Sequence, residues 1–289
     1  MFRNRLLSSA VLIPVVLGLT YLGGVWFLGL ALFVLMLASR EYADLLKHDG
    51  EGPSPAIVVV VTWLFLLDVS FPQATLFRFA LTVALLGTLV WALVHFERGH
   101  ADSAADWAWT LAGSLYLGWM GAHFVLLRNV GLGSGKTWLN LGHGEGLWWT
   151  ALALSSTWLA DTGAYFAGRA WGRQKMSPLV SPSKTWAGFV GGVVLGTLGG
   201  AGVALLLRLV AGALGQMTVM TIWDGLALGA LVSLLSPLGD LGESMLKRYA
   251  GAKDSGRLIP GHGGMFDRID SLLWAAVIAF YYAVWIARL

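Results

Sequence analysis

The stretch LLSSAVLIPVVLGLTYLGGVWFLGLALFVLMLAS, Leu6–Ser39, contains 34 residues and no charged side chain. The apolar region of a secretory signal peptide is only about 7–15 residues long, so this stretch is too long to be one. A helix needs about 20 apolar residues to cross the hydrocarbon of a bilayer, with about 17 as the lower limit. Because two glycines, Gly23 and Gly24, stand near its middle, we predict two short membrane-spanning helices that meet there.

Similar charge-poor runs continue along the whole chain. Nine of them are candidate spans, at residues 6–22, 24–39, 55–71, 74–96, 107–128, 147–168, 186–212, 222–239 and 271–288. Their apolar residues are consecutive, whereas strands of a membrane β-barrel alternate apolar and polar residues over about ten positions. We therefore predict an all-α, polytopic integral membrane protein with about nine transmembrane helices. We expect two regions, 1–105 with about four spans and 106–289 with about five spans and the catalytic motifs.

The composition excludes several other classes of protein. Of the 289 residues, 57% are hydrophobic and only 12% are charged, against about 25% charged residues in ordinary soluble domains. The mean hydropathy is +0.70. A soluble enzyme, a disordered protein or a nucleic-acid-binding protein with a broad basic face needs more polar surface than this chain has. The absence of cysteine excludes disulfides and thiolate metal sites.

The distribution of Lys and Arg predicts the orientation in the membrane. With the N-terminus in the cytoplasm, 14 of the 19 basic residues fall on the cytoplasmic side, three fall outside and two fall within spans. Basic residues near a span are retained on the cytoplasmic side. We therefore expect a multi-pass protein of the inner (plasma) membrane, with the polar stretches 169–185 and 240–270 and the active site facing the cytoplasm. The net charge of +3 is explained by orientation, so we expect no nucleic-acid partner.

Charged residues are concentrated in the second of these polar stretches. It holds ten of the chain's 35 charged residues, Asp240, Glu243, Lys247, Arg248, Lys253, Asp254, Arg257, Asp267, Arg268 and Asp270. Asp240, Glu243 and Lys247 are spaced so that they share one face of a helix. Carboxylates bind Mg²⁺ and basic side chains neutralise phosphate oxygens, so this combination favours phosphoryl chemistry over an ordinary cytosolic loop. The turn Pro260–Gly264 can bring backbone N–H groups against an anion.

The first polar stretch offers further groups. Ser181-Pro182-Ser183-Lys184-Thr185 precedes a predicted span, where hydroxyls, a lysine and helix N-terminal amides together can bind phosphate. The alternative is an ordinary Ser/Thr helix cap with a lysine that reaches the membrane surface. Asp161 lies late in an otherwise uncharged run, and a carboxylate within a span is a functional candidate.

Small residues mark one face of the seventh predicted span. Four glycines repeat there every four residues, at Gly188, Gly192, Gly196 and Gly200. A helix face without side chains allows another helix to approach closely. We expect packing within the chain, with a homodimer interface as the alternative. Three histidines are scattered without metal-ligand spacing and are expected to be structural or solvated: His95, His123 and His143.

The motif from Ser244 to Asp270 resembles the signature of the phosphatidate cytidylyltransferases (CDP-diacylglycerol synthases) of bacterial type. It reads SMLKR at 244–248, KDSG at 253–256 and IPGHGGMFDRID at 259–270. Residues 161–169 and 181–185 are similar to upstream elements of that family, in which many members carry Lys at the position of Ser183. The resemblance is strongest over 155–275, and the first 150 residues are similar only as a hydrophobic multi-span region.

This resemblance implies a reaction and a set of roles. An oxygen of phosphatidic acid attacks the α-phosphorus of CTP, giving CDP-diacylglycerol and pyrophosphate, with Mg²⁺ required and a second cation as an option. Asp240 and Asp267 are implied as metal ligands. The residues implied in catalysis are Asp240, Lys247, Arg248, Asp267 and Arg268. The residues implied in substrate binding are Asp161, Ser181, Lys184, Thr185, Glu243, Lys253, Asp254, His262, Gly263, Gly264 and Asp270.

Two other classes of protein stay open at this point. A CTP-dependent lipid kinase of the dolichol-kinase type uses similar groups but attacks the γ-phosphorus and releases CDP. A cation or phosphate transporter carries its ionisable residues in mid-span with a path to both sides, whereas here they concentrate on one side. The partners expected from the resemblance are CTP, phosphatidic acid and the lipid bilayer, with a homodimer as a further option.

Overall fold

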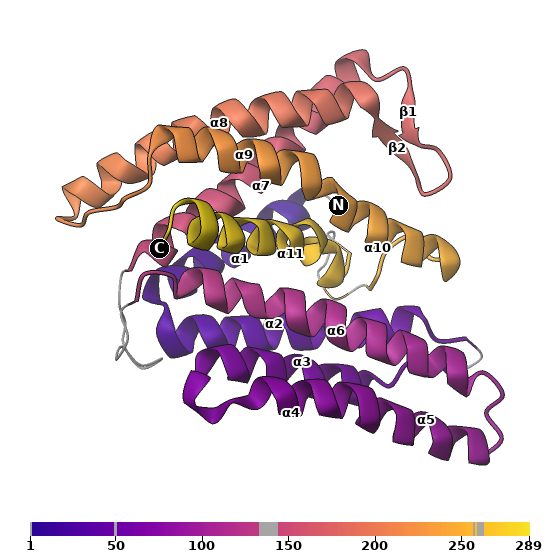
Figure 1. Ribbon diagram of the computed structural model, residues 1–289. Helices are drawn as coiled ribbons and strands as arrows, with labels where there is room; N and C mark the ends of the chain where they lie inside the picture. Colours follow the sequence, from indigo (N-terminus) through magenta and orange to yellow (C-terminus); the bar gives the residue numbers. More distant parts are fainter. Residues whose placement is uncertain (1, 49–50, 133–143, 257, 259–262) are drawn as a thin grey trace. The chain divides into compact units, whose positions relative to one another are not determined.

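The computed structural model describes residues 2–48, 51–132, 144–256, 258 and 263–289, and almost all of its regular structure is helical (Figure 1). The chain forms two compact units that are interleaved along the sequence. The first comprises the described residues within Met1–Leu126 and Leu246–Ile269. The second comprises those within Leu127–Gly135, His143–Met245 and Asp270–Leu289. Helices α10 (Pro237–Tyr249) and α11 (Phe266–Tyr281) are each divided between the two units.

Six helices make up most of the first unit. They are α1 (Phe2–Leu22), α2 (Gly24–Leu45), α3 (Pro55–Ser70), α4 (Leu76–Thr82), α5 (Thr88–Glu97) and α6 (Ser103–Arg128), with the 3-10 turn η1 (Pro72–Ala74) and the π-helical turn η2 (Val83–Gly87). Gly23 separates α1 from α2 with a φ of 66°, which favours glycine, so the predicted break is confirmed. α6 packs closely on α2, because a Cβ at Gly121 would lie 2.5 Å from Leu35 Cδ1.

The second unit contains a helical bundle and a small hairpin. Its elements are α7 (Glu145–Trp171), β1 (Lys175–Ser177), β2 (Ser181–Thr185), α8 (Trp186–Ala213), α9 (Ile222–Leu235), the start of α10, most of α11 and the π-helical turn η3 (Tyr282–Ile286). β1 and β2 are antiparallel, with Lys175 opposite Thr185 and Ser177 opposite Ser181. The all-α prediction missed this hairpin, because its short polar strands show no apolar alternation.

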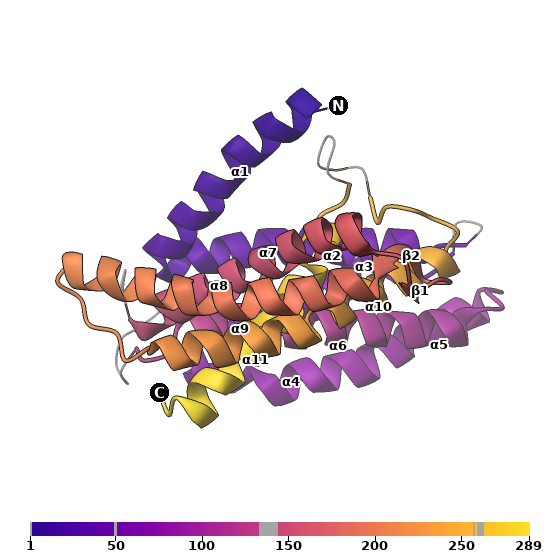
Figure 2. The same cartoon turned by 90° about the horizontal axis from the view of Figure 1, so that it is seen from above.

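The glycine face of α8 is buried within the second unit. α7, α8 and α9 lie side by side in both views (Figure 1 and Figure 2). A Cβ at Gly192 would lie 2.9 Å from the Ala160 carbonyl oxygen on α7, and one at Gly200 would lie 3.1 Å from Gly229 Cα on α9. The prediction of packing within the chain is therefore confirmed. The alternative of a homodimer interface on this face is wrong, because α7 and α9 already cover it.

Leucine at Gly192 should destabilise this helix packing, because the new side chain would meet the backbone of α7. We expect Gly192→Leu to lower the thermal unfolding midpoint of the purified protein in detergent by several degrees or to abolish its monodisperse elution. Gly202→Leu is the matched control on the same helix, since nothing lies within 4 Å of a Cβ there. Equal thermal midpoints for the two variants would contradict the packing described here.

Six helical stretches of the described residues are long and apolar enough to cross a membrane: Gly24–Leu45, Leu76–Glu97, Ser103–Arg128, Trp186–Ala213, Ile222–Tyr249 and Phe266–Ile286. Leu12–Leu22 and Pro55–Ser70 are shorter apolar helices. All nine predicted runs lie mainly within helices. The helical class of an integral membrane protein is therefore confirmed, whereas nine spans, the division at residues 105/106 and the orientation stay predictions.

Candidate active site

Three carboxylates of the second unit converge where α10 and α11 meet. We call Asp240, Glu243 and Asp270 the acidic cluster, since one oxygen from each lies within 4.8 Å of those of the other two. Asp240 and Glu243 are three residues apart on α10, so they share a helix face, while Asp270 comes from α11. Glu243 is only 2% exposed and Asp270 only 8%. Three hard oxygen donors at this spacing fit Mg²⁺, which binds to carboxylates together with substrate phosphates.

A glycine allows the two helices to come this close. A Cβ at Gly239 would lie 2.6 Å from Trp274 Cδ1 and even closer to the Asp270 carbonyl oxygen. Any side chain at this position would therefore push α10 away from α11 and separate the carboxylates. The sequence placed Asp240 and Asp270 in one polar stretch but did not indicate that Gly239 sets their distance.

Lysine 184 brings a positive charge to the acidic cluster. Its Nζ lies 2.8 Å from Asp240 Oδ2 and donates a hydrogen bond to the Pro237 carbonyl oxygen at 3.3 Å. The other oxygen of Asp240 accepts a hydrogen bond from Ser244 Oγ at 3.2 Å. The β1–β2 hairpin places Lys184 here, because it turns the chain back just before α8 begins. The structure thus brings together the two polar stretches that the sequence placed on one side of the membrane.

The neighbours of Lys184 in β2 serve the local structure. Thr185 caps α8, since its Oγ1 accepts a hydrogen bond from the Gly188 N–H at 3.1 Å. Ser181 is buried, and its Oγ lies 3.4 Å from Ser183 Oγ. The helix-cap alternative therefore describes Thr185, whereas Lys184 contacts a carboxylate of the acidic cluster. Asp161 is exposed on α7.

Asp267, at the start of α11, belongs to the first unit and has a different set of neighbours. Lys247 Nζ lies 2.6 Å from its Oδ1. Its Oδ2 accepts hydrogen bonds at 2.9 Å from the Ser255 N–H, the Ser255 hydroxyl and the Gly264 N–H. Asp267 therefore faces a cation and three donors, whereas Asp240 faces two further carboxylates and Lys184.

Glu41, on α2, is a functional candidate that the sequence analysis missed. Its Oε2 accepts a hydrogen bond from the Phe266 N–H at 2.9 Å. The same oxygen lies 3.3 Å from Ser255 Oγ, whose proton is nearer to Asp267. Gly264 packs directly against it, because a Cβ there would clash with the Glu41 carboxylate and with Ser255 Oγ. Glu41 thus fixes both ends of the segment that surrounds Asp267. The available signal was its position two residues after the uncharged run that ends at Ser39.

The remaining predicted residues lie at the surface or outside the described part. Arg248, Lys253, Asp254 and Arg268 are exposed. Arg248 Nη1 donates to the Ala252 carbonyl oxygen at 3.4 Å, which keeps it at the end of α10. Gly263 adopts a φ of 81°, a conformation that favours glycine, directly before the Gly264 N–H that binds Asp267. His262 lies outside the described residues.

Comparison with known proteins gives this arrangement a context. The model of the cytidylyltransferase family matches residues 3–286. The chain belongs to the cytidylyltransferase family. Three curated relatives carry the name phosphatidate cytidylyltransferase. The protein from Synechocystis sp. is 35% identical, over 97% of this chain and 96% of its own length. Those from Pseudomonas aeruginosa and Brucella suis are 33% and 31% identical, over 99% and 97% of this chain and 98% and 92% of their own lengths.

Membership of the cytidylyltransferase family makes the chain a nucleotidyltransferase and confirms the resemblance found in the sequence. A cytidylyltransferase must bind the strongly anionic triphosphate of CTP. Carboxylates that hold a divalent cation, with a lysine beside them, are the groups such a substrate requires. The acidic cluster and Lys184 bring residues of these two types together within one unit.

Proposed function

We propose that this chain transfers CMP from CTP to phosphatidic acid, giving CDP-diacylglycerol and pyrophosphate. The observation that carries the proposal is the acidic cluster with Lys184, located in a chain that matches the cytidylyltransferase family over nearly its whole length. The relatives named phosphatidate cytidylyltransferase support phosphatidic acid as the acceptor. The apolar helices support a membrane setting, which suits a lipid substrate.

The proposed reaction needs no nucleophile from the protein. A phosphate oxygen of phosphatidic acid forms the new bond to the α-phosphorus of CTP. The bond from the α-phosphorus to its bridging oxygen breaks, and pyrophosphate leaves with the electron pair. The attacking oxygen is already anionic, so the protein contributes positioning and charge neutralisation.

Each residue of the acidic cluster then has a defined role. Asp240, Glu243 and Asp270 would hold Mg²⁺ through hard carboxylate oxygens. The chemistry supplied by the ion at this place would be neutralisation of negative charge on the CTP phosphates and polarisation of the reacting phosphoryl group. Lys184 holds Asp240 in place and offers its ammonium group to a phosphate oxygen.

The first unit supplies a second set of proposed contacts. Asp267 is the candidate ligand for a second cation, since the family resemblance implies both Asp240 and Asp267 as metal ligands. Lys247, which contacts Asp267, is a candidate phosphate ligand together with the exposed Arg248 and Arg268. Lys253, Asp254 and the backbone of Gly263 and Gly264 are proposed to bind substrate, as are Asp161, Ser181 and Thr185.

We propose that the protein lies in the inner membrane of the cell. Its active site then faces the cytoplasm. The support is the excess of basic residues that the predicted topology places on the cytoplasmic side, 14 of 19. CTP then arrives from the cytosol, while the acyl chains of phosphatidic acid stay in the bilayer and only the headgroup reaches the polar site.

Two isotopic labels of CTP test this function directly. Purified protein with Mg²⁺ and phosphatidic acid should transfer label from [α-³²P]CTP into lipid, while label from [γ-³²P]CTP should appear only in pyrophosphate. Reactions with diacylglycerol in place of phosphatidic acid are the control and should give no labelled lipid. Transfer of the γ-label into lipid would assign the chain to CTP-dependent kinases and overturn the proposal.

A further inference from the structure

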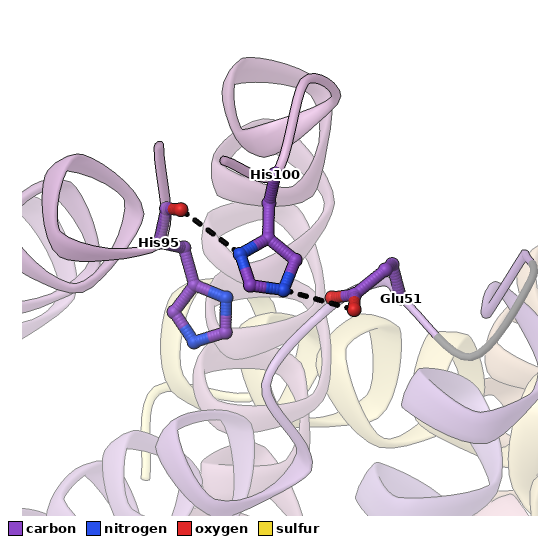
Figure 3. A group of neighbouring side chains, drawn as sticks. All are labelled: Glu51, His95 and His100. Atoms are coloured by element: carbon purple, nitrogen blue, oxygen red, sulfur yellow. Dashed lines mark hydrogen bonds and ion pairs between the residues drawn. The ribbon is translucent and has the colours of Figure 1, made fainter. Parts of the chain in front are cut away.

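Three ligand-type side chains of the first unit, none of them in the proposed active site, converge at two chain connections (Figure 3). Glu51 lies between α2 and α3, His95 in the last turn of α5, and His100 between α5 and α6. One ligand atom from each lies within 4.8 Å of those of the other two. The spacing of His95 and His100 did not reveal this group, because His100 lies beyond the end of α5, where helical periodicity no longer applies.

The hydrogen bonds of His100 fix which ring nitrogen carries a proton. Its Nδ1 lies 2.9 Å from the His95 carbonyl oxygen, which can only accept, so Nδ1 donates. Its Nε2 lies 2.9 Å from Glu51 Oε1, and a carboxylate oxygen also only accepts. A neutral imidazole has a single N–H, and Nδ1 uses it. The lone pair of Nε2 therefore faces a carboxylate at close range, which is favourable only if a cation binds there.

That cation is either a second proton on His100 or a metal ion, and the surroundings favour a metal ion. The His95 ring lies beside the His100 ring with centroids 4.8 Å apart, so a second imidazole is available as a ligand. Trp91 packs on the His95 ring with centroids 4.5 Å apart and holds it in place. A ring N–H bound to a backbone carbonyl, as at His100, is the usual outer-shell contact of a metal-binding histidine.

The nearby negative charge and the types of ligand atom indicate which metal ion this group would bind. Asp106 adds a negative charge near Glu51 and the two histidines. Two imidazole nitrogens and one carboxylate oxygen form a mixed donor set that suits Zn²⁺ and disfavours Mg²⁺, which prefers oxygen ligands. Zn²⁺ binds nitrogen and oxygen at about 2.0–2.2 Å, a distance that partly exposed side chains can reach by small rotations.

We propose that Glu51, His95 and His100 bind one Zn²⁺ ion, with water as the fourth ligand. The ion fastens the α2–α3 connection to the α5–α6 connection within the first unit. Its role is structural, and it is independent of the proposed transfer of CMP.

A zinc titration of the full-length protein tests this site. Protein purified in detergent is stripped with a chelator, dialysed, and titrated with ZnCl₂ against a chromophoric zinc indicator. Millimolar Mg²⁺ is kept present so that the acidic cluster is occupied by its own preferred ion. We expect one Zn²⁺ per chain with micromolar or tighter affinity, confirmed by elemental analysis. Co²⁺ in place of Zn²⁺ should give visible absorption bands typical of a four-coordinate N/O site.

Matched histidine variants identify the ligands. His95→Gln and His100→Gln should each weaken zinc binding by at least about 100-fold, because loss of even an outer-shell partner costs about 10–100-fold. His48→Gln is the control, since His48 is exposed in the same connection as Glu51 but is not in the group. All three variants should elute as monodisperse proteins in detergent, which shows that they fold.

Two results would overturn the proposal. The first is wild-type protein that binds no stoichiometric Zn²⁺ in the presence of Mg²⁺, which would assign the cation at His100 to a second proton. The second is an equal loss of zinc affinity in His48→Gln and His100→Gln. Neither result bears on the isotopic test of CMP transfer, so the two proposals fail independently.

Discussion

Asp240→Asn should lower the rate of CDP-diacylglycerol synthesis by at least about 10²–10³-fold, the usual cost of removing one charge contact from a transition state. Asparagine keeps the size of the side chain but removes the charge from the proposed Mg²⁺ ligand that Lys184 also contacts. Initial rates at several Mg²⁺ concentrations measure the effect. The variant should also require more Mg²⁺ for half-maximal rate, which a purely structural defect would not produce.

Asp44→Asn is the matched control for this experiment. Asp44 also forms an ion pair with a lysine, Lys47, but lies exposed at the end of α2 and outside the proposed site. Exposed pairs of this kind contribute about 0–1 kcal/mol to stability, so this variant should keep nearly the wild-type rate. Near-normal, Mg²⁺-dependent synthesis by Asp240→Asn would remove Asp240 from the metal site.

Asp267→Asn should reduce both activity and stability. Asp267 and Lys247 form a pair whose side chains are only 9% and 12% exposed, and removal of one partner from such a pair costs about 3–5 kcal/mol. The same carboxylate accepts three hydrogen bonds from Ser255 and Gly264, so the segment around it should lose order. We expect a rate at least about 10²-fold lower and a thermal midpoint several degrees lower in detergent.

A double variant separates the two roles of Asp267. Lys247→Met combined with Asp267→Asn leaves no uncompensated charge, so its loss of stability should be smaller than the sum of the losses in the single variants. Activity should stay low in the double variant if both side chains serve the reaction. Recovery of activity together with stability would show that Asp267 acts only as an anchor for its segment.

The helices could be predicted from the sequence because hydrophobic length is a local property. The runs without charge, the glycine break at Gly23 and the four-residue spacing of Gly192 and Gly196 each follow from one stretch of chain. The site residues could be recognised by type for the same reason, since the charges of the stretch 240–270 are concentrated in a short segment. Local sequence patterns therefore indicate where the helices lie and which residues are candidates for the site.

The grouping of those residues could not be predicted, because it depends on packing between distant segments. Asp267 and Asp270 are one helical turn apart, and spacing alone does not decide which of them joins Asp240. The Glu41 contact joins residues 225 positions apart. Glu51, His95 and His100 come from two chain connections that are far apart in the sequence. The hairpin that positions Lys184 has no apolar periodicity by which it could be recognised.

The hydrogen bond between Glu41 and the Phe266 N–H has a consequence for biosynthesis. The ribosome adds about 5–20 residues per second, so the partner of Glu41 emerges roughly 11–45 s after Glu41 itself, given their separation of 225 residues. During that time α2 is already synthesised and carries a carboxylate whose final partners do not yet exist. The segment around Asp267 therefore assembles last, and a nascent chain that stops before Gly264 cannot complete it, however well its earlier helices have inserted.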